Sequence, residues 1–433
     1  MDKQIIFNKS QCYIISQDNG IQEEEPVTIE AYNKFSDGST LVQLNNRVFG
    51  VLKTNSSNPE TSYIDDYEII KSDIAELFDV DHEETRRIVS DTENIGVFTE
   101  LNYSKDVETR ISATAVFNHL ISYANKGLLS EEENSWITEV LNLSKEKTNT
   151  TIKDVNSIEK IIEFGFYALV KDIEFQTGKT YDAKSKEALK KNYIRMILFD
   201  YIIDRRYRGL DYYLISGLNA QQKPLFLDAR FSPISVNSSI DKENSIKIGE
   251  YYINNCLIDK EILMDVLFNK YYKDIKKMTE ALNDAQRLYK DAISRIIYNN
   301  TELEKAVELE DLIFDNLLRI NKRQKDKEKS NDKDLKTNKI ERTMATQSLN
   351  VRVTAKLDLI QKKYPVNPKE HPELIEMRKK KKNKESNEKI KLIVEKEKNK
   401  KAGFANVSTI ISVISLICGI GIGIAYALLT IGR

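Results

Sequence analysis

The sequence predicts an α+β fold with a β-rich N-terminal region, a helical region, and one apolar helix near the C-terminal end. Short runs of β-forming residues alternate with turn residues between positions 5 and 54. From about residue 113 onward, apolar residues recur at helical spacing. The stretch 403–431 contains no charged side chain, although 31% of the 433 residues in the chain are charged.

The N-terminal strands are expected to pair as antiparallel hairpins. Their sequences are QCYIIS, VTIEAYNKF, LVQLNN and RVFGVLKT, and turn residues such as Asp18-Asn19-Gly20 and Asn45-Asn46 separate them. The turn Asp37-Gly38-Ser39-Thr40 is a candidate phosphate loop, because glycine lets backbone N–H groups face an anion and the hydroxyls add donors. Taken alone, the same four residues are also typical of an ordinary hairpin turn.

Residues 192–231 hold the strongest chemical signal in the chain. A buried helix is expected over the apolar and aromatic stretch Tyr193–Ile203, and a charged run from Asp204 to Gly209 ends it. Two strand-like runs follow, Asp211–Ile215 and Pro224–Leu227, and the second leads to Asp228. A helix, a charged loop, two strands and a carboxylate follow one another in this order in the C-lobe of protein kinases, where they form the catalytic and metal-binding loops.

The motifs in this stretch resemble those of the HipA-like serine/threonine kinases. In that family a helix ending FDxLIGN leads into a catalytic loop, DRHxxNxGxL, and then into a strand ending PLYDNG. Phe199–Ile203 reads FDYII and matches the helix end, and Pro224–Asp228 reads PLFLD and matches the second motif with one extra residue. The resemblance has usable motifs over residues 27–235.

The catalytic loop matches the family in two partial ways. Aligned from its right-hand end, Asp211 takes the place of the metal-binding Asn, and Arg206 takes the place of the catalytic Asp. Aligned from its left-hand end, Asp204 stands at the catalytic Asp, and Gly209 stands at the Asn. A guanidinium cannot accept a proton. The motif therefore looks eroded, and either Asp204 has taken over catalysis or phosphoryl transfer has been lost.

A lysine and a glutamate in the N-terminal region fit the same family. Lys53 ends the apolar strand of residues 49–53, as does the kinase lysine that holds the α- and β-phosphates. A helix is expected from Ile64 to Phe78, and its alignment with the family places Glu68 on the family's glutamate. The resemblance implies an ion pair between Lys53 and Glu68 that positions the lysine for a nucleotide. The alternative is that both are solvent-exposed charges. The apolar residues on one face of this helix are Tyr67, Ile70, Ile74, Leu77 and Phe78.

The resemblance implies a two-lobed, protein-kinase-like fold that binds ATP and Mg²⁺ in a cleft between the lobes. The predicted parts are a β-rich N-lobe at 1–105, a helical C-lobe at 106–320, a charged basic linker at 321–402 and a transmembrane helix at 403–431. The implied roles are nucleotide binding by Gly38, Ser39, Thr40, Lys53 and Glu68, metal binding by Asp211 and Asp228, and catalysis by Asp204 or Asp211.

The C-terminal stretch is predicted to span a membrane once, since about twenty apolar residues suffice to cross a bilayer as a helix. The N-terminal residues lack the pattern of a secretory signal, so the body is expected in the cytoplasm. The basic run Arg378–Lys382 marks the cytoplasmic side and favours anionic lipid, and no nucleic-acid partner is expected. Small residues every four positions also suit homo-oligomerisation, through Ser415, Gly419, Gly423 and Ala427.

The cysteines and histidines give no metal or catalytic motif. The three cysteines are scattered, which suits a reducing compartment. The three histidines, His82, His119 and His371, share no motif and are interpreted as surface residues or as satisfied core residues.

Three functional hypotheses remain open at this point. The first is a membrane-anchored kinase-fold protein that has lost catalysis and acts as a nucleotide-responsive or structural interaction module. The second is an active Ser/Thr kinase. The third is a membrane-tethered scaffold without a kinase fold, for which Lys53, Glu68 and Asp228 would lie far apart. The first hypothesis is favoured, because the catalytic loop is the part of the motif that is eroded. The sequence does not identify a protein partner.

Overall fold

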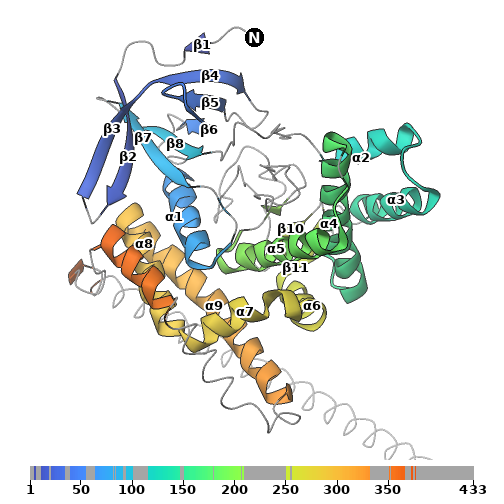
Figure 1. The fold of residues 1–433 in the computed structure, drawn as a ribbon. Coiled ribbons are helices and arrows are strands. Elements are labelled where there is room, and N and C mark those ends of the chain that lie inside the picture. The colour runs from blue at the N-terminus through green and yellow to red at the C-terminus, as the bar shows by residue number, and fades with distance from the viewer. Residues whose placement is uncertain are drawn as a thin grey trace, which may run out of the picture. The chain divides into compact units, whose positions relative to one another are not determined.

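The computed structural model describes residues 4–5, 11–18, 21–34, 40–54, 64–80, 82, 84–90, 94–100, 116–146, 151–178, 180–205, 207–208, 250–253, 256–331, 351, 353–365, 372–373 and 376. The chain divides into two compact units, Met1–Asn367 and Pro368–Arg433. Every labelled helix and strand lies in the first unit (Figure 1).

The N-terminal region is a curled, eight-stranded antiparallel sheet with the order β1-β4-β5-β6-β8-β7-β2-β3 (Figure 1). One helix, α1 (Ile64–Leu77), interrupts the strands along the chain, between β6 and β7. The strands are β1 (Gln4–Ile5), β2 (Cys12–Asp18), β3 (Ile21–Val27), β4 (Ile29–Lys34), β5 (Thr40–Leu44), β6 (Val48–Thr54), β7 (Thr85–Ser90) and β8 (Asn94–Glu100).

The residues in the turns and the alternation of apolar residues along the strands explain why this sheet forms. Asn45 and Asn46 both have positive φ, at 49° and 54°, which a tight hairpin requires and asparagine tolerates, so the turn predicted here is confirmed. The Asn45 side chain also accepts a hydrogen bond from the Thr28 backbone N–H at 2.8 Å. Alternate strand residues point to one face and form an apolar cluster: Cys12, Ile14, Val27, Ile29, Val42, Leu44, Leu52, Ile88, Ile95 and Phe98.

The remainder of the first unit is mainly helical, with a small three-stranded sheet in the order β11-β10-β9. The helices are α2 (Val116–Asn125), α3 (Glu131–Glu146), α4 (Val155–Thr177), α5 (Ala183–Ile202), α6 (Lys260–Lys270), α7 (Tyr272–Asp284), α8 (Gln286–Asn300) and α9 (Leu303–Asn331). The strands are β9 (Tyr207–Arg208), β10 (Glu250–Ile253) and β11 (Cys256–Asp259). The structure is therefore a mixed fold of antiparallel sheet and helices, as the sequence predicts.

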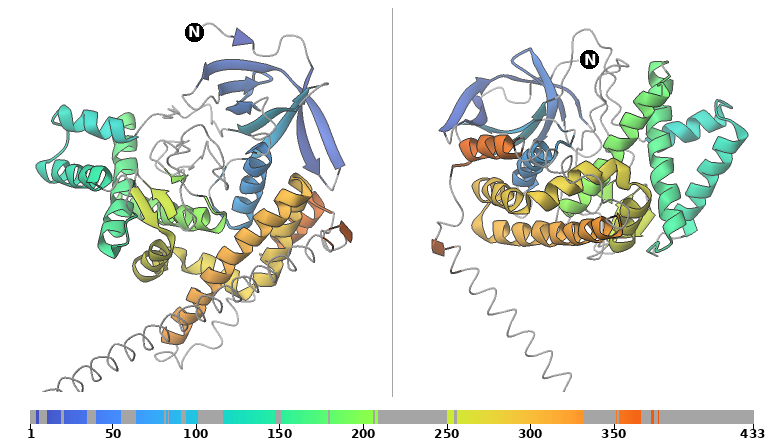
Figure 2. Two further views of the ribbon diagram at one scale, coloured as in Figure 1. Left: turned by 180° about the vertical axis from the view of Figure 1, so that it is seen from behind. Right: turned by 60° about the horizontal axis from the view of Figure 1, so that its bottom comes forward.

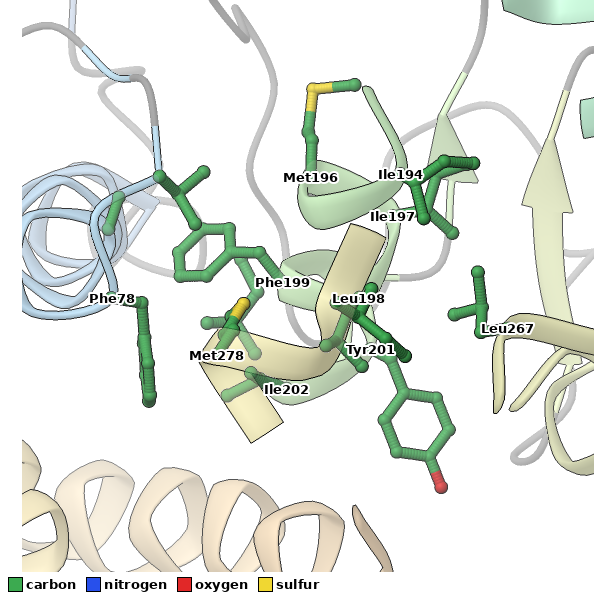
Figure 3. Packing of buried hydrophobic residues seen from close by; sticks show 14 of the residues in the cluster. Phe78, Ile194, Met196, Ile197, Leu198, Phe199, Tyr201, Ile202, Leu267 and Met278 are labelled. Carbon is green, nitrogen blue, oxygen red and sulfur yellow. The ribbon is translucent and has the colours of Figure 1, made fainter. Parts of the chain in front are cut away.

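Helix α5 lies at the centre of the helical core. Nine of its ten residues from Tyr193 to Ile202 are buried, the exception being Arg195, which agrees with the predicted buried helix. Fully burying one such apolar side chain contributes roughly 2 kcal/mol. Phe199 of α5 packs edge-on against Phe78, the residue after α1 (Figure 3). Phe78 also stacks on Tyr289 of α8 with the ring centroids 5.0 Å apart, so α1 and the helical core share one apolar cluster.

The ordered fold extends further along the chain than the predicted C-lobe boundary at residue 320. Helix α9 continues to Asn331, and residues 353–363 form another helix, both inside the stretch predicted as a linker. Apolar residues at helical spacing explain the second helix, because Val353, Leu357, Ile360 and Tyr364 are all buried in the main core. The sequence predicts a linker here because the apolar residues of this stripe are surrounded by lysines.

The predicted transmembrane helix at 403–431 lies outside the described residues, together with Ser415, Gly419, Gly423 and Ala427. Among the residues that the structure describes, no helix is both long and apolar enough to cross a bilayer.

Candidate functional site

The predicted ion pair between Lys53 and Glu68 is present. Lys53 Nζ on strand β6 lies 2.7 Å from Glu68 Oε1 on helix α1. The Glu68 side chain is 1% exposed and the Lys53 side chain is 15% exposed, so neither is the solvent-exposed charge of the alternative interpretation. A buried carboxylate is costly unless it is paired, and this pair joins the helix to the sheet.

Strand register explains why Lys53 faces α1. Lys53 lies opposite Val97 on β8, and Val97 lies opposite Arg87 on β7, so the three residues form a row across the sheet. Residues paired directly across strands share one face of a sheet. Both cations in this row bind acids of α1, since Arg87 Nη2 lies 2.5 Å from Asp66 Oδ1. The helix therefore sits on the sheet through two ion pairs that flank the buried Val97.

A second lysine completes the environment of Glu68. Lys71, one turn further along α1, places Nζ 2.8 Å from Glu68 Oε2, so each carboxylate oxygen has its own lysine. Burial alone would raise the pKa of Glu68, but the charges of Lys53 and Lys71 outweigh it and lower the pKa to about 2. Glu68 is therefore ionised at neutral pH and holds both ammonium groups.

The proposed phosphate loop, residues 37–40, ends at the first residue of the strand that pairs with β6. Thr40 is the first residue of β5 and pairs with Leu52, the neighbour of Lys53 on β6. The other two proposed loop residues, Gly38 and Ser39, lie outside the described residues. A lysine that is oriented by a buried carboxylate is suited chemically to bind the phosphates of a nucleotide.

Asp204, a candidate catalytic residue, lies at the C-terminal end of α5. Its φ of 55° is in the left-handed region, which aspartate tolerates better than most residues. Its side chain is buried and forms an ion pair with Lys260, the first residue of α6, which is also buried. Asp259, the residue before Lys260, caps α6 by accepting hydrogen bonds from the backbone N–H groups of Glu261 and Ile262 at 2.9 and 3.1 Å.

Two more charged residues lie beside Asp204 in the core. Asp200, on the last turn of α5, is fully buried, and Arg205 is 2% exposed. Arg205 Nη1 lies 3.9 Å from Asp200 Oδ1, and its backbone N–H donates to the Asp200 carbonyl at 2.8 Å. Two acids, Asp200 and Asp204, thus lie close to two bases, Arg205 and Lys260 of α6, and this pairing reduces the cost of burying each charge.

The other candidate site residues are not placed by the structure. Asp211 and Asp228, the proposed metal ligands, lie outside the described residues, as does Arg206. Within the described ranges, no group of three or more His, Cys, Asp or Glu side chains is arranged to hold a metal ion. The structure therefore brings Lys53 and Glu68 together, and it places Thr40 opposite Leu52, the residue before Lys53.

His119, Tyr123 and Asp172 form a polar cluster that no motif in the sequence predicts. His119 on α2 places Nδ1 2.8 Å from Oδ1 of Asp172 on α4, and the Tyr123 hydroxyl donates to the same oxygen at 3.0 Å. Asp172 is 1% exposed, and burial together with its charge raises the pKa of Tyr123. His119 is thus a satisfied residue, as expected, but the sequence offered no signal for a partner 53 residues away.

Comparison with known proteins yields similarity to solved structures but not to known sequences. No protein-family model matches the chain, and no characterised protein sequence matches it. Among solved structures, the crystal structure of a proinflammatory kinase of Helicobacter pylori, CtkA, resembles it with a TM-score of 0.40 and 10% sequence identity. The similarity covers 69% of this chain and 96% of that chain.

Proposed function

We propose that this protein binds ATP with Mg²⁺ in a kinase-type cleft without transferring the phosphoryl group, and acts as a HipA-like, nucleotide-responsive interaction module. The observation that carries the proposal is the ion pair between Lys53 and Glu68. Protein kinases use a strand lysine held by a helix glutamate, in this order along the chain, to position the lysine on the α- and β-phosphates.

The remaining parts of the proposed cleft come from the sequence motifs. Gly38, Ser39 and Thr40 would supply donors to the phosphates, and Asp228, with Asp211, would hold Mg²⁺. Mg²⁺ would supply positive charge beside the phosphates, and Lys53 would hold the phosphates in place.

Loss of catalysis is supported by the surroundings of Asp204. A general base must reach the proton that it accepts within hydrogen-bond distance. Asp204 is instead buried and paired with Lys260, and the other alignment of the loop places an arginine at the catalytic position. An active Ser/Thr kinase that uses Asp211 as the base is the competing proposal.

The proposal includes attachment of the cytoplasmic body to the cell membrane through 403–431. The uncharged length of that stretch and the basic run Arg378–Lys382 before it support a single span. Anionic lipid would attract the basic run at about 1 kcal/mol per cation near the surface. Flotation of the full chain with vesicles of neutral and of anionic lipid tests both features.

Thermal melting of the full chain, held in mild detergent, with ATP, Mg²⁺ or both tests the nucleotide site. A ligand that binds only the folded state at a hundredfold excess over its dissociation constant adds about 2.7 kcal/mol. A Mg²⁺-dependent rise in melting temperature is expected, and Lys53→Met should abolish it. Lys190→Met is the matched control, since Lys190 pairs with Glu163 at 2.6 Å in the helical region and should keep the nucleotide response.

Two outcomes would change the proposal. If the wild type does not respond at millimolar ATP and Mg²⁺, or if Lys53→Met responds equally, the nucleotide site is wrong. If the wild type transfers phosphate from radiolabelled ATP to itself or to a test protein, and Asp211→Ala stops the transfer, the active kinase replaces the pseudokinase.

A further inference from the structure

The C-terminal half of α1 is covered by a segment that follows it in the sequence by about 290 residues. Residues 353–365 lie against α1, and Figure 2 shows this segment in orange-red beside the blue helix. Four apolar side chains anchor it in the main core at spacings of four, three and four residues: Val353, Leu357, Ile360 and Tyr364. This is the apolar stripe of an amphipathic helix.

Asp73 on α1 is the main polar contact of this segment. Its Oδ1 lies 2.7 Å from Lys363 Nζ, and its Oδ2 accepts a hydrogen bond from the Tyr364 hydroxyl. Asp73 is 14% exposed, and Tyr364 is almost fully buried. A carboxylate that is bound on both oxygens by neighbouring residues of one segment fixes that segment's position along the helix.

A second contact forms at the C-terminal end of α1. Lys356 Nζ donates to the Glu76 carbonyl at 2.9 Å and pairs with Asp79, just beyond the helix. The last turn of α1 contains no basic residue of its own, although its carbonyls carry the negative end of the helix dipole. Lys356 therefore supplies, from the distant segment, one of the cations that this helix end needs.

A third contact fixes the end of the segment on α8. Arg295 Nη1 donates to the carbonyls of Tyr364 and Pro365 at 3.1 and 3.0 Å. Helix α8 also contacts α1 directly, because Tyr289 stacks on Phe78. The segment and α8 thus both pack against the C-terminal half of α1. Glu68, in the N-terminal half of α1, faces Lys53 on the sheet.

We propose that residues 353–365 are a built-in ligand of α1 that holds Glu68 against Lys53, so that release of this segment loosens the ion pair. Its effect on nucleotide affinity rests on the proposed function, whereas its effect on α1 does not. In the sequence, the segment lies between α9 and the basic run Arg378–Lys382. Whatever engages the chain beyond residue 365 can therefore act on Glu68 through α1.

Hydrogen–deuterium exchange of the full chain in mild detergent tests the effect on α1 without any nucleotide. Lys363→Glu breaks the contact with Asp73, and Lys362→Glu is the matched control, because the neighbouring lysine is exposed and the charge change is the same. We expect amides of the first half of α1, including Glu68, to exchange about tenfold faster in Lys363→Glu than in wild type, because local opening becomes more frequent. Lys362→Glu should match the wild type.

Exchanging the two charges distinguishes loss of the contact between Asp73 and Lys363 from general destabilisation of the protein. Asp73→Lys alone should loosen α1, and Asp73→Lys combined with Lys363→Asp should restore protection. The proposal is overturned if Lys363→Glu exchanges no faster than Lys362→Glu, or if faster exchange stops at residues 353–365 and leaves the turn around Glu68 protected.

Affinity for a fluorescent ATP analogue tests the consequence separately. Lys363→Glu should bind about fivefold more weakly than Lys362→Glu, because only the conformers with an ordered α1 are competent to bind. If α1 exchanges faster but the affinity does not change, residues 353–365 stabilise α1 without affecting nucleotide binding, and that part of the proposal is wrong. If the wild type binds no nucleotide, the proposed function fails, and the exchange experiment still decides the docking.

Discussion

Lys53 on strand β6 and Glu68 on helix α1 form an ion pair of 2.7 Å in which the carboxylate is almost completely buried. Lys71 binds the second carboxylate oxygen, so Glu68 is the ion-pair partner of two ammonium groups. Removing one partner of a buried pair is more costly than the pair is worth, because the remaining charge stays buried. Stability and the proposed nucleotide site therefore depend on the same side chain.

The low pKa of Glu68 predicts a specific pH dependence. Its pKa falls from 4.5 to about 2 on folding, so its contribution is fully present above pH 4.5 and is lost as the pH falls toward 2. A difference of this size corresponds to roughly 3 kcal/mol. In urea unfolding, Glu68→Gln should be less stable than wild type at pH 7, and the gap should narrow between pH 4.5 and 2.5. A gap that stays constant over this range would contradict the assigned pKa.

Much of the N-terminal fold could be predicted because local signals and tertiary structure agree there. The helix expected over Ile64–Phe78 is observed as Ile64–Leu77, and the residues assigned to its apolar face are all buried. Strand β3 was not expected, because its sequence, IQEEEPV, contains three consecutive glutamates and a proline. Such residues suit an edge strand, and edge pairing depends on the partner strand more than on local preference.

The helical region shows where local signals end. Apolar residues recur at helical spacing throughout residues 257–297, but the structure contains a short strand and three helices there, with breaks at Tyr271 and Ala285. Neither break contains glycine or proline, so only the packing of the helices against one another specifies it. Similarly, Lys71, Lys260 and Asp172 acquire their roles from contacts that no spacing rule connects.

Gly50 is predicted to be required for the fit between β6 and β8. A Cβ at this position would lie 2.2 and 2.3 Å from atoms of the Phe98 ring and 2.5 Å from the Thr99 carbonyl oxygen. Overpacking of this kind typically costs about 1–3 kcal/mol. Gly50→Ala should therefore lower the urea midpoint. Adding Phe98→Leu should recover only part of the loss, because the Thr99 oxygen belongs to the backbone; an unchanged midpoint for Gly50→Ala would refute the close contact.

Asn316 is predicted to stabilise the end of α5. From α9, its Nδ2 donates to the carbonyls of Tyr201 and Ile202 at 2.8 and 3.3 Å, and the side chain is buried. Asn316→Leu leaves buried carbonyls without this donor, at a cost of about 1–3 kcal/mol. Asn300→Leu is the control, since Asn300 is half-buried and its Nδ2 donates to a carbonyl within its own helix. Equal losses in the two variants would show that Asn316 has no special role.

The pairing of Asp204 with Lys260 distinguishes a structural role from a catalytic one. Lys260→Met removes the partner of a buried carboxylate and should cost about 3–5 kcal/mol in urea unfolding. Asp204→Asn added to Lys260→Met should recover much of this loss, because asparagine removes the charge and tolerates the positive φ at this position.

The same variants decide the chemistry. If Asp204 serves the fold, ATP binding should persist in Asp204→Asn with Lys260→Met, and the two substitutions should not change phosphate transfer from radiolabelled ATP, which the proposed function expects to be absent. If the wild type transfers phosphate and Asp204→Asn abolishes the transfer without lowering stability, Asp204 is the general base. In that case the ion pair with Lys260 must open before each turnover, and Lys260→Met alone should transfer phosphate faster than the wild type.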